Sequence, residues 1–179
     1  MIRAFVALAV PPAVGHSLAR LQAGLPLPRP VPQDGFHLTL SFLGEQPEDL
    51  LTEAHHALAA IRAPGFGLQV AGAGLFGGDR PHTVFAALAP STPLMALQAK
   101  VDVALRRIGI APEARRFTPH VTLGRVRPNR AAAARLAAAV ADAAGFLAPP
   151  WPVDGFGLWR SDPAPGGRVY AEVMRYPLG

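Results

Sequence analysis

The 179-residue sequence predicts an α+β fold of two similar lobes around a central cleft, each lobe an antiparallel sheet with helices on its outer face. Three observations predict it. Stretches with helical and strand periodicity alternate along the chain. The order helix, motif strand, helix, strand, strand occurs once in each half. A His-x-Thr-x tetrapeptide recurs in the corresponding strand of each half, at His37 and His120. This weak internal repeat predicts two lobes that share one cleft.

The first half opens on an apolar segment that we interpret as a buried strand. A signal peptide is disfavoured because Pro11 and Pro12 close the run before a small-residue cleavage site. Pro47 suits the first position of a helix. The predicted elements are a strand at 2–9, a helix at 12–22, a Pro-rich connection at 26–32, a strand at 37–43, a helix at 47–61 and strands at 67–75 and 83–88.

The second half repeats this order. Gly109 follows the first helix at the position of a C-terminal cap, and Gly145 ends an alanine-rich helix. The predicted elements are helices at 92–108 and 130–144 and strands at 120–126, 153–160 and 168–173, the last two separated by a turn-rich segment at 162–167. We expect residues 1–179 to form a single bilobal domain with a seam between the repeats near 90–93.

Composition narrows the class of protein. The chain has no cysteine, which excludes disulfides, thiolate metal sites and a cysteine nucleophile, and fits a cytoplasmic location. No run of about 18 apolar residues is present, so no membrane span is expected. Basic residues outnumber acidic ones by 17 to 12, which favours polyanionic partners such as RNA. A GC-rich genome is the alternative explanation of the arginine-rich composition.

The two tetrapeptides place polar side chains on one strand face. Residues i and i+2 of a strand point to the same side, so His37 and Thr39 are expected to face the cleft while Leu38 enters the core. The same alternation applies to His120 and Thr122. A single His-x-Thr in a strand is usually structural, but two copies in matching strands predict a catalytic pair.

Histidine suits acid and base roles in phosphoryl chemistry at neutral pH, since its ordinary pKa is near 6.5. The threonine hydroxyls are expected to donate hydrogen bonds to phosphate oxygens, where negative charge develops. No Asp or Glu lies beside either motif, so we expect no metal ion and no other cofactor.

The sequence resembles the 2H phosphoesterase superfamily and, within it, the RNA 2',3'-cyclic phosphodiesterases, once called 2'-5' RNA ligases. The resemblance spans nearly the whole chain. It rests on MIRAFVALAVPP at 1–12, HLTLSFLGE at 37–45, RFTPHVTLGRVR at 116–127 and LWRSDPAPGGRVYAEV at 158–173. Ser41 departs from the family pattern, which often has Lys or Arg at this position.

The resemblance implies the 2H phosphoesterase fold and hydrolysis of RNA 2',3'-cyclic phosphate ends to 2'-phosphomonoesters. It makes His37 the proton donor to the leaving 3'-oxygen and His120 the proton acceptor from water. The sequence alone does not assign these two roles. The same site run backwards would join a cyclic phosphate end to a 5'-hydroxyl through a 2'-5' bond.

Three further residues are candidate substrate contacts. By resemblance, Arg125 contacts the phosphate. Strict alternation puts it on the face opposite His120, so we expect a bulge at Gly124, with a solvent-facing Arg125 or a role for Arg127 as alternatives. Phe42 is a candidate for base stacking, with core packing as the favoured alternative. Ser161 is a candidate cleft residue, with turn formation as its alternative.

Two other functions remain open. The site would also suit small nucleotides, such as ADP-ribose cyclic phosphate or 2'-5' oligoadenylate, or the chain could be a non-catalytic RNA-binding module. The expected partner is RNA with cyclic phosphate ends, tRNA fragments among the candidates, and the expected state is a monomer. The remaining histidines are interpreted as ordinary surface residues: His16, His55, His56 and His82.

Overall fold

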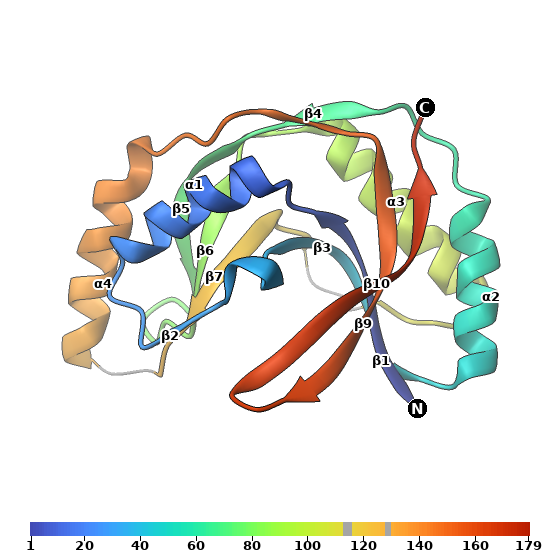
Figure 1. The fold of residues 1–179 in the computed structure, drawn as a ribbon, viewed down its shortest axis with the longest axis horizontal. Coiled ribbons are helices and arrows are strands. Elements are labelled where there is room, and N and C mark those ends of the chain that lie inside the picture. The colour runs from blue at the N-terminus through green and yellow to red at the C-terminus, as the bar shows by residue number, and fades with distance from the viewer. Residues whose placement is uncertain (113–115, 128–129) are drawn as a thin grey trace.

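The computed structural model describes residues 1–112, 116–127 and 130–179, and it forms two lobes of strands and helices (Figure 1). The strands are β1 (Ile2–Ala9), β2 (Arg29–Pro30), β3 (His37–Gln46), β4 (Phe66–Leu68), β5 (Val70–Phe76), β6 (Thr83–Leu88), β7 (His120–Arg125), β8 (Trp151–Val153), β9 (Gly155–Ala164) and β10 (Gly167–Pro177). The helices are α1 (Pro12–Ala23), α2 (Glu48–Ala59), α3 (Thr92–Arg107) and α4 (Arg130–Asp142), with 3-10 turns at Gln33–Gly35 and Ala143–Gly145.

The main sheet is antiparallel throughout the described chain. Its strands follow the order β10-β9-β1-β3-β7-β6-β5, and β2 pairs with β7 off this path. The motif strands β3 and β7 are neighbours that meet at one residue pair, Leu38 and Val121. The predicted fold class of two antiparallel lobes with helices is therefore confirmed, and the two lobes join where the motif strands touch.

The lobes do not follow the order of the two sequence halves. In one lobe, β3 pairs with β1, and β1 pairs in turn with β9 of the β9–β10 hairpin from the end of the chain. In the other, β7 pairs with the β5–β6 hairpin from the first half. Each lobe thus contains strands from both halves. Residues 90–93 lead from β6 into α3.

Each lobe is also covered by one helix from each half of the chain (Figure 1). Helix α3 packs on β3 and α2 packs on α3, whereas α4 packs on β5 and α1 on β7. One apolar core runs beneath these helices, and Leu38 and Val121 are fully buried members of it. Among the described helices, none combines the length and apolar character that crossing a bilayer requires.

Most element boundaries agree with the predicted ones, and the differences have local causes. Helix α2 begins at Glu48, because Pro47 has an extended backbone, with a ψ of 156°, and forms the N-cap. The predicted strand at 67–75 is divided into β4 and β5. Val153, the first residue of the predicted strand at 153–160, belongs to β8 instead, and β9 begins at Gly155. Gly109 follows α3 with a φ of +85°, the left-handed conformation that glycine adopts at low cost.

Candidate active site

A cleft of about 510 Å³ lies where the two lobes meet. Both motif strands contribute to its wall, as do β1 and the β9–β10 hairpin. The structure brings all of the predicted site residues to this cleft: His37, Thr39, Phe42, His120, Thr122, Arg125 and Ser161. Residues that are 83 positions apart in the sequence thus line one cavity.

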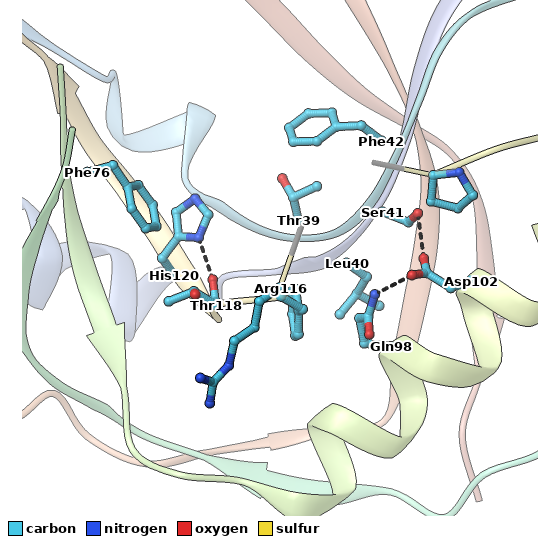
Figure 2. Close-up of a pocket in the computed structure, with 12 residues that line it drawn as sticks. Thr39, Leu40, Ser41, Phe42, Phe76, Gln98, Asp102, Arg116, Thr118 and His120 are labelled. Carbon is cyan, nitrogen blue, oxygen red and sulfur yellow. Dashed lines mark hydrogen bonds between the residues drawn. The ribbon is translucent and has the colours of Figure 1, made fainter. Parts of the chain in front are cut away.

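Each motif histidine is held in the same way. His37 Nδ1 lies 2.8 Å from the carbonyl oxygen of Gly35. His120 Nδ1 lies 2.7 Å from the carbonyl oxygen of Thr118, a contact that is drawn in Figure 2. A carbonyl oxygen can only accept, so Nδ1 carries the proton and donates in both rings. The bonds fix the tautomer and leave Nε2 as the nitrogen that would exchange a proton.

Aromatic side chains pack against both rings. The His37 ring lies 4.8 Å from Phe5 and 4.7 Å from Tyr170, centroid to centroid. The His120 ring lies 4.8 Å from Phe76 and 5.5 Å from Phe85. These contacts restrict the orientation of each imidazole and keep water from one side of it.

Burial lowers the pKa of His37 below its ordinary value of 6.5. The hydrogen bond to Gly35 opposes this shift, and the positive charge that His120 can carry adds to it. The unliganded cleft therefore favours the neutral imidazole of His37. A bound anionic phosphate would act in the opposite direction, because a nearby negative charge favours the protonated ring.

A β-bulge in β3 decides where Phe42 points. The register of β1 against β3 shifts between Thr39 and Ser41, so Leu40 is the extra residue. Strict alternation would have put Phe42 on the core face with Leu38. After the bulge its side chain is 40% exposed and lines the cleft, so the prediction of core packing is wrong.

A β-bulge also occurs in β7. The register of β6 against β7 shifts between Thr122 and Gly124, so Leu123 is the extra residue, immediately before the predicted position. The shift turns Arg125 to the cleft side, where it joins His120 and Thr122. Arg127 is exposed and lies outside the described lining of the cleft.

Ser161 lines the cleft and binds Arg168, a second lining residue that was not among the predicted site residues. It is 5% exposed, and its hydroxyl accepts a hydrogen bond from Arg168 Nε at 2.5 Å. Arg168 Nη2 also donates to the carbonyl oxygen of Ser161 at 2.6 Å. Ser161 thus holds the Arg168 guanidinium at the cleft wall. Arg168 lies in the family-like segment at 158–173 and begins the predicted strand at 168–173, but strand periodicity alone does not distinguish it from a surface arginine.

The described lining of the cleft is basic. Arg3, Arg125 and Arg168 contribute to it, together with His82, which the sequence had suggested to be ordinary surface. The described lining contains no Asp or Glu side chain. Within the described residues, no three His, Cys, Asp or Glu side chains gather in an arrangement that would hold a metal ion. The cleft is suited to an anionic group placed between two histidines.

Comparison with known families gives a match over most of the chain. Residues 10–165 match the family model described as the 2'-5' RNA ligase superfamily. An RNA 2',3'-cyclic phosphodiesterase of Thermus thermophilus is 32% identical over 190 residues, which cover 99% of this chain and 90% of the relative. An RNA 2',3'-cyclic phosphodiesterase of Aeropyrum pernix is 35% identical over 120 residues, covering 63% of this chain and 68% of the relative.

Solved structures give the same picture of the fold. E. coli LigT complexed with 3'-AMP superposes with a TM-score of 0.82 at 27% identity, covering 99% of this chain and 98% of that one. A crystal structure of a Thermus thermophilus protein superposes with a TM-score of 0.81 at 28% identity, covering 98% of this chain and 97% of that one. The similarity extends over both lobes and the cleft between them.

Proposed function

The chain belongs to the 2'-5' RNA ligase superfamily, and we propose that it hydrolyses RNA ends carrying a 2',3'-cyclic phosphate to 2'-phosphomonoesters. Relatives of this activity match it over up to 99% of its length. One structural observation carries the assignment of the site: His37 and His120 line one basic cleft, each with Nδ1 bonded to a backbone carbonyl.

The reaction uses the two histidines as acid and base. A water oxygen forms a bond to phosphorus while the bond from phosphorus to the 3'-oxygen breaks. One imidazole takes the proton from water, and the other gives a proton to the 3'-oxygen, so a 3'-hydroxyl and a 2'-phosphate result. Following the family resemblance, His37 is the donor and His120 the acceptor.

Neighbouring groups stabilise the charge that develops on phosphate. The hydroxyls of Thr39 and Thr122 donate to the non-bridging oxygens. The guanidinium of Arg125 supplies a fixed positive charge that pairs with an anionic oxygen. No metal ion takes part in this scheme. The anionic substrate also raises the pKa of His37, so the His37 ring holds the proton that its donor role requires.

The substrates are RNA ends, tRNA fragments among them, and the site also joins a cyclic phosphate to a 5'-hydroxyl through a 2'-5' bond. In dilute solution hydrolysis dominates because water is abundant. The protein acts as a monomer in the cytoplasm, and its residues fold as one bilobal domain, since each lobe needs strands from both halves.

The test is hydrolysis of an RNA oligonucleotide with a terminal 2',3'-cyclic phosphate in the presence of EDTA. We expect a 2'-phosphate product from the wild type and from His56→Ala, a control histidine that is exposed on α2. His37→Ala and His120→Ala should each lower kcat by roughly 10²–10⁴-fold. If the protein bound RNA without turnover, and neither substitution changed this binding, the chain would be an RNA-binding module and not an enzyme.

A further inference from the structure

A second, smaller pocket opens beside the cleft, and we refer to it as the side pocket. It has a volume of about 180 Å³ and lies between β3 and α3 (Figure 2). Thr39, Phe42, Phe76 and His120 line both the side pocket and the cleft. A ligand held between the histidines therefore has direct access to the side pocket.

The side pocket contains a carboxylate that is fixed in place. Ser41 Oγ donates to Asp102 Oδ1 at 2.8 Å, and Gln98 Nε2 donates to Asp102 Oδ2 at 2.8 Å (Figure 2). Ser41 is buried on the core side of the β3 bulge. A carboxylate has about four lone-pair directions, so each oxygen retains one for a ligand. Because these two hydrogen bonds already hold the Asp102 carboxylate, Asp102 loses little side-chain entropy when a ligand binds.

The walls of the side pocket are aromatic. Phe42, Phe76 and Phe117 all line the pocket, and the first two are labelled in Figure 2. Arg116 belongs to the lining, but its guanidinium points away from Asp102. Apolar walls with one fixed acceptor suit a flat ring that presents N–H donors.

Charge separates the two cavities. The described lining of the cleft is basic and contains no acidic side chain, whereas Asp102 lies in the side pocket. A phosphate group is attracted to the cleft and repelled by the carboxylate. In a nucleoside 2',3'-cyclic phosphate, the base is attached to C1', which is bonded directly to C2'. The base of that nucleotide is thus the part of the substrate that can reach the side pocket.

Resting on the proposed function, we propose that the side pocket binds the base of the nucleotide that carries the cyclic phosphate, and that Asp102 selects guanine. The Watson–Crick edge of guanine presents two adjacent donors, N1–H and the 2-amino group, which match the two carboxylate oxygens. Adenine and cytosine present one amino group beside an unprotonated ring nitrogen. Uracil presents one N–H between two carbonyl oxygens, which a carboxylate repels.

The experiment compares kcat/KM for the 2',3'-cyclic phosphates of guanosine, adenosine, cytidine and uridine. We expect wild type to favour guanosine over uridine by roughly 10-fold or more, the discrimination typical of a bidentate base contact. Asp102→Asn should bring this ratio close to one, and Gln98→Ala should lower it partly. Asp49→Asn removes the same charge from an exposed position on α2 and should leave the ratio unchanged.

A second readout separates this proposal from the proposed function. Calorimetry measures binding of guanosine and uridine 2'-monophosphates and requires no turnover. Guanine-selective binding without hydrolysis would contradict the proposed function and support the base site. Hydrolysis without base preference, or an Asp102→Asn variant that loses activity equally on the four substrates, would overturn the base site.

Discussion

The two motif strands share a backbone plan and differ in what they carry beyond it. In β3 and β7 the histidine donates to a carbonyl two residues earlier, and a threonine follows two residues later. A bulge then occurs at the residue after the threonine, Leu40 in one strand and Leu123 in the other. The side chain five positions after the histidine turns into the cleft in both, and it is Phe42 in β3 and Arg125 in β7.

A symmetric backbone frame can thus support an asymmetric substrate. The repeated backbone supplies two equivalent imidazoles and hydroxyls for the phosphorus, which needs groups on opposite sides. The residue five positions after each histidine differs between the strands. Arg125 supplies a positive charge for the anionic phosphate, and Phe42 supplies an apolar surface for the rest of the substrate. Burial also lowers the pKa of His37.

The largest effect expected within this comparison comes from the threonines. Thr39→Val and Thr122→Val each remove one donor to the phosphate oxygens while keeping the side-chain shape. Each should lower kcat by roughly 10²–10³-fold, the usual effect of losing one such donor. Steady-state hydrolysis of the cyclic phosphate oligonucleotide measures both. A large loss in one strand with none in the other would mean that the two motifs are not equivalent.

The bulge leucines test whether the lobes fold together. Leu40 and Leu123 are almost completely buried, so Leu40→Ala and Leu123→Ala should each cost about 2–5 kcal/mol of unfolding free energy. Both should shift one cooperative transition in calorimetry. If either variant unfolded in two transitions, the lobes would be independent folding units. That result would contradict the expectation that lobes built from strands of both halves fold together.

Substitutions at Arg125 and Phe42, each five positions after its histidine, should separate the effect of charge from the effect of apolar contact. Arg125→Met should lower kcat/KM by roughly 10-fold or more, since a hydrogen bond to a charged group contributes about 1.5–3 kcal/mol. It should also reduce the dependence of RNA affinity on salt, because one counterion-releasing contact is lost. Phe42→Leu should leave the salt dependence unchanged. Equal salt dependence in wild type and Arg125→Met would remove Arg125 from the phosphate site.

The smallest expected effect is a shift of the pH profile. Tyr170→Ala admits water to His37, reduces its desolvation and so raises its pKa. If His37 is the proton donor, kcat/KM falls as pH rises through this pKa, so the alkaline limb moves to higher pH in the variant. Phe76→Ala, next to His120, is the matched variant in the other lobe. If neither limb moves in Tyr170→Ala, His37 is not one of the two groups whose titration sets the pH profile.

Much of the frame could be predicted from the sequence because it depends on local periodicity. The strands at 2–9 and 83–88 have the predicted bounds, and the glycine at 124 pointed to the irregularity that turns Arg125 inward. No comparable signal marks the bulge at Leu40, because the sequence there keeps a regular apolar pattern. Period-two alternation therefore put Phe42 on the wrong face.

Long-range pairing was beyond the reach of these patterns. The exchange of the two hairpins between lobes depends on which strand edges meet after folding, and an isolated strand has the same periodicity with either partner. The side-pocket carboxylate depends on a contact between Ser41 and Asp102, which are 61 positions apart. Neither residue carries a local signal of that contact.

Two equivalent motifs that act as one acid–base pair should be energetically coupled, and a double-mutant cycle measures this coupling directly. Rates of cyclic phosphate hydrolysis would be measured for wild type, His37→Ala, His120→Ala and the double variant. Residues that act as a unit are strongly non-additive, so the double variant should be little slower than the slower single one. If the two losses simply multiplied, the histidines would act independently, and the account of a shared proton-transfer site would be contradicted.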